Sequence, residues 1–411
     1  MRDSHFEESV VIEDNAVQSQ PLRIALVTET FPPEVNGVAL TIARLASQLR
    51  SHGHTVQIIR PRQSRADGES PAGAVLTMGF PIPNYPGLRF GAPAQRLLVK
   101  QWSRHRPDIV HVATEGPLGY SAVKAAKRLR IPVTSDYRTN FDAYSKHYGF
   151  GWLRRPIKGY LIRFHNLCDA TFAPSADQLD TLAQHGYQRL RLLGRGIDSE
   201  IFNPARRDLK LRQTWGADAE RPVVIFVGRL APEKNLATLI KTIRAMLEVQ
   251  PNLLPVIVGD GPKASMLRQA IPEAVMPGFQ SGESLAAHYA SADMMLFPSL
   301  TETFGNVTVE ALACGVPVVA YNYAAAAKLV AHQRSGLLAE PGDEDAFVAA
   351  ALEWIGHPNT RPQWSEHCVQ AVRHLTWDGI ATQIETVWRS LIAQKLDVPS
   401  RDTPSLATER T

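Results

Sequence analysis

Residues 296–320 read LFPSLTETFGNVTVEALACGVPVVA, a pattern that predicts a strand, a loop, a short helix and a second strand. Glu302 stands in the loop, and Glu310 stands in the helix that Phe304 and Gly305 open. The first amides of a helix lack intrahelical partners and can bind an anion. Two carboxylates at this spacing can accept hydrogen bonds from two hydroxyl-bearing parts of one ligand. Taken alone, both could be surface charges, and their neighbours decide between the two interpretations.

The composition of the chain limits its class. At 411 residues it is too long for one ordinary core and fits two domains. Its 44% hydrophobic and 20% charged content is typical of a soluble globular protein. The net charge of +4 gives no support to nucleic-acid binding. Three scattered cysteines form no metal-binding spacing, no apolar run is long enough to span a membrane, and the N-terminus is too polar for a signal peptide. We therefore expect a cytoplasmic protein.

Strand and helix patterns alternate through both halves of the chain, in the order of βαβ units. The first series begins with RIALVTET at 23–30 and ends at a Gly/Asn/Pro-rich linker near 198–204. The second series restarts with the buried strand PVVIFVG at 222–228. We therefore predict two doubly wound α/β domains, residues 21–203 and 204–377, that face each other across a cleft.

Four segments lie outside these two series. Residues 1–20 and 396–411 lack periodicity, so we expect a disordered N-terminal arm and a disordered C-terminal tail. Residues 64–90 are rich in Pro and Gly, and we expect a loop that crosses the mouth of the first sheet. Residues 377–395 form an amphipathic pattern that predicts a final helix.

The motif VGRLAPEKN at 227–235 is the strongest additional indication of a ligand site, beside residues 296–320. It follows a buried strand, and Gly228 leaves the backbone free to turn. Arg229 and Lys234 bring two cations close together, which suits a diphosphate. The alternative is a surface pair between Arg229 and Glu233. The chain has neither GxGxxG after a strand nor GxxxxGK[ST], so dinucleotide and P-loop sites are not indicated.

Two residues of the first half stand where parallel sheets bind ligands. Gly37 lies in a strand-to-helix turn, where the backbone can approach a ligand or simply turn tightly. His111 falls at the carboxyl end of the predicted strand DIVHVA. A histidine there is either a ligand-facing residue or a hydrogen-bonded core residue, and the pattern leaves both open.

Several motifs together resemble the retaining nucleotide-sugar glycosyltransferases of family 4, which have the GT-B fold. They are NGV at 36–38, GRLAPEKN at 228–235, VGDGP at 258–262, ETFGNVTVEALACGVPVVA at 302–320 and SGLL at 335–338. The resemblance covers roughly residues 23–388, and the order and number of the motifs make it specific. It implies an enzyme with a cleft between two Rossmann-like domains.

The resemblance also implies a role for each candidate residue of the second half. Arg229 and Lys234 would bind the donor diphosphate, Glu302 would contact the transferred sugar, and Glu310 would hold the ribose hydroxyls. The backbone near Gly228 and the amides of the segment Phe304, Gly305, Asn306 and Val307 would complete the donor site.

For the first half, the resemblance implies that Gly37 lies by the diphosphate and His111 beside the reacting sugar. His111, Glu302, Arg229 and Lys234 would thus be the catalytic residues. The last helix, 378–395, would pack back on the first domain.

The resemblance implies no cofactor beyond the nucleotide sugar and no metal. Fixed cations and helix-terminal amides can stabilise the charge that gathers on a leaving diphosphate. The acidic run 343–345, DED, lies at a predicted helix start, where it caps the helix and complements its dipole. Retention without an obvious nucleophile implies attack by the acceptor hydroxyl from the side that the phosphate leaves.

Within the family, HVATEGPLG at 111–119 and TSDYRTNFDAYSKHYG at 134–149 look most like GDP-mannose-dependent α-mannosyltransferases and glycolipid synthases. The expected reaction is transfer of a sugar, foremost mannose from GDP-mannose, to a lipid or glycan hydroxyl. One alternative is a UDP-sugar-dependent glucosyl- or glucuronosyltransferase that makes diacylglycerol glycolipids. A nucleotide-sugar epimerase or a sugar-binding protein of similar layout is a more remote alternative.

The acceptor side is less well defined. Arg138 and Asp142 stand where many family members have histidines, and we place them on the acceptor side. Residues 149–167 contain aromatic and basic side chains that suit the inner face of an anionic membrane, namely Trp152, Arg154, Arg155 and Lys158. An ordinary core-packed helix with a solvated basic face explains the same pattern.

Overall fold

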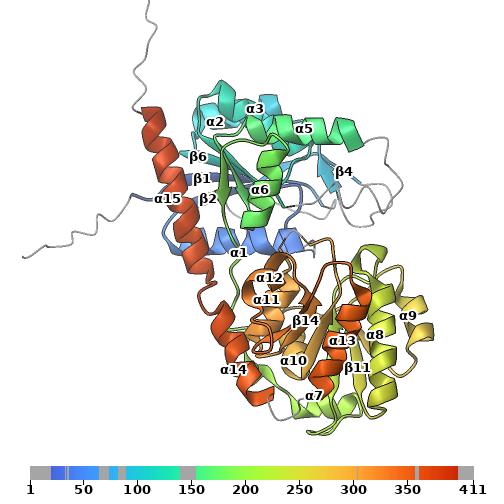
Figure 1. Ribbon diagram of the computed structural model, residues 1–411. Helices are drawn as coiled ribbons and strands as arrows, with labels where there is room; N and C mark the ends of the chain where they lie inside the picture. The colour runs from blue at the N-terminus through green and yellow to red at the C-terminus, as the bar shows by residue number, and fades with distance from the viewer. Residues whose placement is uncertain are drawn as a thin grey trace, which may run out of the picture.

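The computed structural model describes residues 20–32, 34, 37–63, 74–81, 89–138, 154–302, 304–356 and 361–396. Figure 1 shows two α/β domains, one above the other, with α1 (Gly37–Ser51) and α12 (Ala324–Leu329) at their junction. The expected N-terminal arm and C-terminal tail fall almost wholly outside the described residues.

The described residues of the first domain form a seven-stranded parallel sheet in the order β3-β2-β1-β6-β7-β8-β9. The strand order reverses between β1 and β6, as in doubly wound folds. The strands are β1 (Arg23–Val27), β2 (Thr55–Pro61), β3 (Ala74–Thr77), β6 (Ile109–Val112), β7 (Val133–Asp136), β8 (Ala170–Ala173) and β9 (Leu190–Leu192). A separate antiparallel pair joins β4 (Gly79–Pro81) to β5 (Arg89–Gly91).

Strand β3 corrects the expectation that residues 64–90 are only a loop. It extends the sheet beside β2, in register from Ile58 with Ala74 to Pro61 with Thr77. The strand is a short edge strand of four residues, and three of them are only half-buried. Such a strand carries little hydrophobic pattern, so the flanking Pro and Gly residues dominate the sequence signal.

Helices cover both faces of the first sheet because side chains of β1 alternate in direction. Ile24 and Leu26 pack in one cluster with α1 and with α15 (Trp377–Leu396). Ala25 and Val27 pack on the opposite face, in a cluster that includes side chains of α2, α3 and α5. The remaining helices of this domain are α2 (Gln95–Arg104), α3 (Pro117–Arg128), α5 (Arg154–Asn166) and α6 (Ala176–Gln184).

The described residues of the second domain form a six-stranded parallel sheet in the order β12-β11-β10-β13-β14-β15. Its strands are β10 (Val223–Val227), β11 (Leu254–Val258), β12 (Val275–Gly278), β13 (Met294–Phe297), β14 (Val318–Tyr321) and β15 (Gly336–Ala339). Its helices are η2 (Pro204–Arg206), α7 (Leu209–Thr214), η3 (Pro232–Lys234), α8 (Leu236–Val249), α9 (Ala264–Ala270), α10 (Gly282–Ala290), α11 (Asn306–Ala313), α12, α13 (Glu344–Ile355) and α14 (Arg361–Val372). Two doubly wound α/β domains are therefore confirmed.

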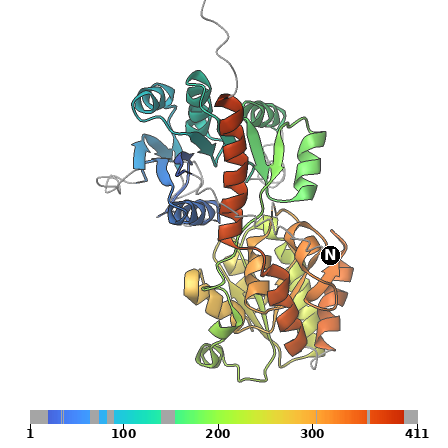
Figure 2. The same ribbon diagram turned by 90° about the vertical axis from the view of Figure 1, so that its left-hand side faces the viewer.

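The final helix, α15, leaves the second domain and lies along the first sheet, as Figure 2 shows. Ile384 and Trp388 are fully buried there, and Trp388 Nε1 donates a hydrogen bond of 3.0 Å to Thr134 Oγ1. The chain thus crosses between the domains twice. The two crossings are joined by a hydrogen bond of 2.7 Å from Ile197 N to Leu375 O.

Candidate active site

The turn after β10 is held in place by the turn after β11. Gly228 N donates to Val258 O over 3.1 Å, and Leu230 N donates to Asp260 O over 2.9 Å. A Cβ at Gly259 would lie 1.9 Å from Gly228 O, so only glycine permits this close approach. The VGDGP motif therefore has a structural role, which is to fix the loop that carries Arg229 and Lys234.

Lys234 and Glu302 form an ion pair at the carboxyl edge of the second sheet. Lys234 Nζ lies 2.5 Å from Glu302 Oε1, and Ser299 Oγ donates to the same oxygen over 2.7 Å. Burial opposes ionisation of Glu302, but the Lys234 ammonium and the two hydrogen bonds outweigh it and lower the pKa of Glu302. Two predicted site residues that are far apart in sequence are thus brought into contact with opposite charges.

Arg229 pairs with Glu233, as the surface-pair alternative expected. Arg229 Nε donates to Glu233 Oε1 over 2.9 Å, and Glu233 is buried whereas the Arg229 side chain is 40% exposed. Thr301 Oγ1 donates to Glu233 O over 3.0 Å, which ties this loop to the one that holds Glu302. The pair fixes the Nε end of the Arg229 guanidinium and leaves much of the Arg229 side chain exposed to solvent.

Helix α11 begins without a side-chain cap. Its first residue follows Gly305, which adopts a left-handed conformation with φ +98°, and no side chain accepts from its first amides within the described residues. The carbonyl of Phe304 accepts from Ala325 N over 2.8 Å, so the turn is held from α12. The amide groups of Asn306 and Val307 therefore remain available for an anion at the positive end of the helix.

Glu310 lies one turn further along α11, in a different setting from Glu302. Tyr289 OH donates to Glu310 Oε2 over 3.0 Å, and Glu310 as a whole residue is half-buried. Burial raises the pKa of Glu310 to about 7, and the Tyr289 hydrogen bond only partly offsets this effect. The two carboxylates therefore differ in charge state near neutral pH, because one has a cationic partner and the other does not.

A small cavity lies against Glu302. Tyr323 OH donates to Glu302 O over 2.5 Å from the segment that precedes α12. The cavity is lined by Phe297, Ser299, Glu302, Phe304, Gly305, Thr308, Ala320, Tyr321, Tyr323 and Ala324–Ala326. Tyr289 and Tyr323 were not predicted from the sequence, since each reaches a glutamate 21 residues away only after the fold has formed.

The acidic run at 343–345 caps a helix, as predicted. Asp343 Oδ1 accepts from Ala346 N over 2.8 Å at the start of α13, and Asp345 pairs with Lys241 over 2.7 Å. Among the residues that the structure describes, no group of three or more His, Cys, Asp or Glu side chains could hold a metal ion.

Comparison with known families covers both domains. Residues 35–201 match the model described as Glycosyltransferase Family 4, and residues 208–368 match the one described as Glycosyl transferases group 1. The chain is 33% identical to a GDP-mannose-dependent alpha-mannosyltransferase of Corynebacterium glutamicum over 92% of both chains. It is 35% identical to one of Mycolicibacterium smegmatis, over 91% of this chain and 99% of the relative. The chain belongs to glycosyltransferase family 4. It is therefore a glycosyltransferase.

Other similarities of this glycosyltransferase are more distant. An alpha-monoglucosyldiacylglycerol synthase of Streptococcus pneumoniae is 26% identical over 84% of this chain and 80% of that protein. The solved structure of Anabaena HepE in complex with UDP has a TM-score of 0.71 and 21% identity, and covers 90% of this chain and 100% of that one. This structural likeness confirms the GT-B fold and carries nothing further.

The two first-domain residues predicted for the site of this glycosyltransferase, Gly37 and His111, differ in their exposure to solvent. Gly37 begins α1 and is exposed, and a Cβ there would meet no atom within 4 Å, so the space beside it is open. His111 has no exposed surface. Its Nδ1 lies 3.0 Å from Thr134 Oγ1 and its Nε2 lies 3.1 Å from Asp136 Oδ2.

His111 is therefore packed in the core of the first domain, and its place beside the reacting sugar stays a prediction. The reason is its position in β6, where it pairs with Leu26 and points toward the face that α15 covers. Its ring centroid lies 5.5 Å from that of Trp388. The core-residue alternative describes what is observed.

The acceptor-side candidates are only partly described. Arg138 is buried and paired with Asp136. In α5, Arg155 is exposed and Lys158 is half-buried. Asp142 and Trp152 lie outside the described residues. Arg154 is the first residue of α5, and its side chain is not among those described.

The left-handed turn before α11 leads to a direct prediction. Gly305→Ala should lower the free energy of unfolding by about 1–2 kcal/mol, because alanine is strained at φ +98°. It should also abolish nucleotide binding, since the turn aims the first amides of α11. Denaturant unfolding and calorimetric titration with nucleotide measure the two effects.

Gly342→Ala is the matched control. Gly342 has φ +88°, is exposed and has no neighbour within 4 Å of an added Cβ. It should lose similar stability and keep nucleotide binding. Equal binding by the two variants would contradict the role of the turn.

Proposed function

We propose that this glycosyltransferase is a retaining, metal-independent α-mannosyltransferase that transfers mannose from GDP-mannose to a lipid or glycan hydroxyl. The observation that carries the proposal is the similarity, over more than nine-tenths of the chain, to two relatives named as GDP-mannose-dependent alpha-mannosyltransferases. The arrangement of Lys234, Arg229, Glu302 and α11 supports it, because it offers cations, free amides and a carboxylate at one edge of the sheet.

The diphosphate of the donor binds at the loop after β10 and at the start of α11. During transfer, the bond between the anomeric carbon and the phosphate oxygen breaks, and negative charge gathers on the diphosphate. Lys234, Arg229 and the amides of α11 stabilise that charge without a metal ion. The cations are held in place before the donor arrives, because Glu302 and Glu233 already pair with them.

The acceptor hydroxyl attacks the anomeric carbon on the face that the phosphate leaves, so the new bond keeps the α configuration. The proton of that hydroxyl passes to an oxygen of the departing phosphate, which completes the balance of the step. Glu302 accepts hydrogen bonds from the sugar hydroxyls, and its lowered pKa keeps it ionised for this role. Glu310 accepts hydrogen bonds from the ribose.

A donor screen tests the proposal. Purified protein with GDP-mannose, GDP-glucose, UDP-glucose and UDP-glucuronate is expected to form glycoside from GDP-mannose, with EDTA present and with a lipid extract as acceptor. Lys234→Ala should lower kcat/KM for transfer about a hundredfold or more, because it removes a cation that stabilises the leaving group. Lys241→Ala, an exposed lysine that pairs with Asp345 on the surface, should transfer at the wild-type rate.

The other outcomes of that screen identify the alternatives. Turnover of a UDP-sugar instead would favour the glycolipid-synthase function, which the similarity to the alpha-monoglucosyldiacylglycerol synthase supports. Conversion of a nucleotide sugar without glycoside product would indicate an epimerase, and binding without turnover would indicate a sugar-binding protein. Transfer that EDTA abolishes would contradict metal independence.

The pH dependence of donor binding should follow the ionisation of the Glu310 carboxyl group. The pKa of its carboxyl is about 7 in the free protein, and only the ionised form accepts two hydrogen bonds from the ribose. Affinity for GDP-mannose should therefore rise about tenfold from pH 6 to pH 8, as the ionised fraction of a group of this pKa rises. Calorimetric titration at several pH values measures this change in affinity for GDP-mannose. Glu310→Gln should bind more weakly at pH 8 and show a flat profile, and an unchanged slope in this variant would assign the pH dependence elsewhere.

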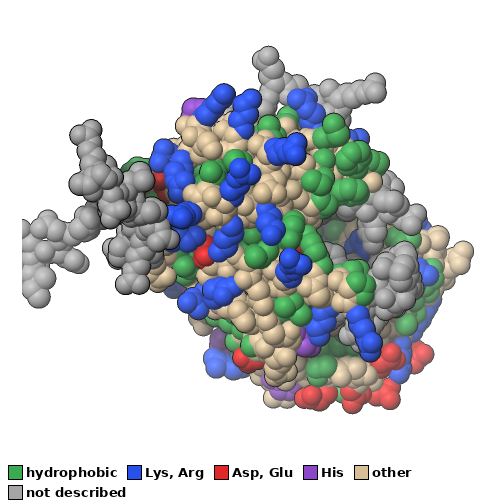
Figure 3. All heavy atoms as spheres, turned by 90° about the horizontal axis from the view of Figure 1, so that it is seen from above, with side chains coloured by type: hydrophobic (Ala, Val, Ile, Leu, Met, Phe, Trp, Pro, Cys, Tyr) green, Lys and Arg blue, Asp and Glu red, His purple; other side chains and the backbone are tan. Residues whose placement is uncertain are grey.

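We also propose that the first domain rests on an anionic membrane surface. None of the residues of α2, α3 and α5 is Asp or Glu, and these helices cover the same face of the sheet. Figure 3 shows basic side chains spread among hydrophobic ones on the upper face of the molecule. Leu97 and Tyr160 are among the exposed large apolar side chains, at 47% and 38%. In the described part of the chain no helix has the length and apolarity to cross a bilayer.

Liposome flotation tests this surface. Arg155→Glu with Lys158→Glu should reduce binding to vesicles that contain anionic lipid by about tenfold or more, since each basic residue near such a surface contributes about 1 kcal/mol. Binding should also weaken with added salt. Lys210→Glu with Arg268→Glu makes the same change of charge at exposed positions of the second domain, and should leave binding unchanged. Equal flotation of both double variants would contradict the proposed surface.

A further inference from the structure

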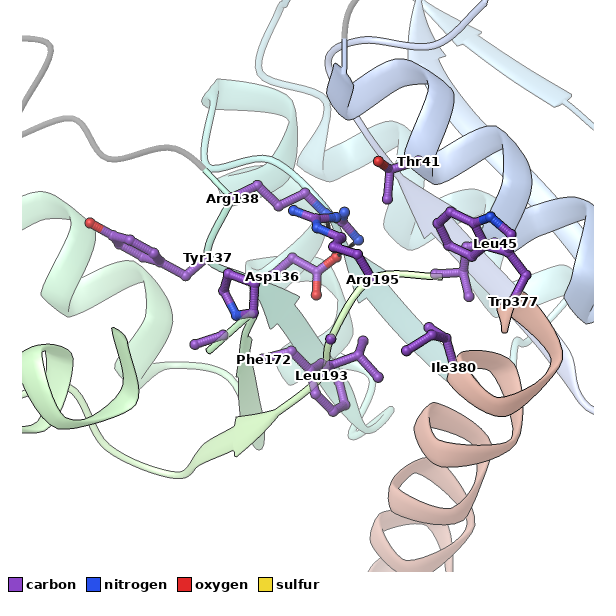
Figure 4. Close-up of a pocket in the computed structure, with 13 residues that line it drawn as sticks. Thr41, Leu45, Asp136, Tyr137, Arg138, Phe172, Leu193, Arg195, Trp377 and Ile380 are labelled. Carbon is purple, nitrogen blue, oxygen red and sulfur yellow. Dashed lines mark hydrogen bonds and ion pairs between the residues drawn. The ribbon is translucent and has the colours of Figure 1, made fainter. Parts of the chain in front are cut away.

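A second pocket lies in the first domain, away from the loops that carry Lys234 and Glu302. It forms where the carboxyl ends of β7, β8 and β9 meet α1, the linker and the start of α15 (Figure 4). Its apolar and aromatic walls come from α1, β8 and α15. The lining residues are Thr41, Leu45, Asp136, Tyr137, Arg138, Phe172, Ala173, Pro174, Leu193, Gly194, Arg195, Trp377 and Ile380.

The charges that line this pocket do not balance. The lining includes one carboxylate, Asp136, and two guanidinium groups, Arg138 and Arg195. Asp136 is already paired with Arg138, through a hydrogen bond of 2.6 Å from Arg138 Nε, and with His111 Nε2 at 3.1 Å. Burial opposes the charge of Asp136, but these two partners lower its pKa to about 2, so it stays ionised. Among the residues that the structure describes, the remaining guanidinium of this lining forms no ion pair with a carboxylate.

Arg195 carries that guanidinium. Its Nε is buried and has no hydrogen-bond partner among the residues that the structure describes. Arg138 and Arg195 line the same pocket, and in the view of Figure 4 both guanidinium groups lie in the region of Asp136. The nearest acidic residue of the linker, Asp198, is taken by Arg44 of α1 over 2.8 Å. Two guanidinium groups that converge in a half-buried site repel one another unless an anion lies between them.

We propose that Arg138 and Arg195 together bind an acidic group, a carboxylate or a phosphate, on the acceptor of the transfer reaction. This inference rests on the proposed function. The acceptor is favoured over the donor because the donor cations, Arg229 and Lys234, belong to the other domain. The apolar and aromatic walls of the pocket suit the sugar or lipid carbon to which the acidic group is attached.

Three soluble acceptors on one scaffold test the proposal without a membrane: a short-chain alkyl glucoside, the matching glucuronide and the matching glucoside 6-phosphate. Wild-type protein should use one of the acidic acceptors with a kcat/KM about tenfold or more above that of the neutral one. Comparison of the two acidic compounds tells carboxylate from phosphate. Equal use of all three would overturn the proposal.

Arg195→Gln should remove most of this preference while it leaves the rate with the neutral glucoside and the affinity for GDP-mannose within about twofold. Its melting temperature should change little, because the buried Nε of Arg195 has no hydrogen-bond partner to lose in the described part of the chain. Arg163→Gln, an exposed position of α5, should keep the preference. If Arg195→Gln lowered kcat/KM equally with all three acceptors, Arg195 would have a merely structural role, and the proposal would be overturned.

Direct binding separates this inference from the proposed function. If GDP-mannose binds but none of the acceptors is glycosylated, ligand-detected NMR with the same three compounds still tests the pocket. Binding of an acidic compound to the wild type that is lost in Arg195→Gln supports the site. No difference between acidic and neutral compounds overturns it.

Discussion

The ion pair between Lys234 and Glu302 joins the two loops on which the donor side of the site depends. Lys234 ends the turn after β10, and Glu302 follows β13, the next strand in the sheet. Neighbouring parallel strands bring their carboxyl ends to one edge, so a sequence separation of 68 residues closes to a direct contact. Each side chain is only 18% exposed, so the cost of removing the two charges from water offsets much of their attraction, and the pair is weak evidence for stability by itself. We propose that its importance is positional, because it holds a cation that can bind phosphate beside a carboxylate that can bind hydroxyl groups.

The two domains build their sites in different ways. The proposed donor site comes from two loops of one sheet and one helix start, held by backbone contacts such as that of Gly259 with Gly228. The pocket of the first domain is assembled from strand ends, the linker and the start of α15. The linker and α15 are also the two chain crossings, so this pocket lies close to the place where the two domains are joined.

The contrast between local motifs and contacts that form only in the folded chain explains which features of the fold and the candidate site can be predicted from the sequence. The alternation of strands and helices predicts both domains, and the motif around Glu302 predicts a donor site, because each signal lies within a short stretch. The partners Tyr289 and Tyr323 leave no local signal. The position of His111 near the end of a strand left open whether it faces a ligand or the core, and its contact with Trp388 of α15 becomes visible only once the fold has formed. The unbalanced charge of Arg195 is visible only once its neighbours are known.

We propose that Lys234 binds the diphosphate of the donor and that Glu302 binds its sugar. Calorimetric titration of Glu302→Gln with GDP and with GDP-mannose tests this division most directly, with wild type and Lys234→Ala beside it. We expect Glu302→Gln to bind GDP within about twofold of wild type and GDP-mannose about tenfold more weakly, whereas Lys234→Ala should weaken the binding of both. Equal weakening of GDP and GDP-mannose by Glu302→Gln would contradict it.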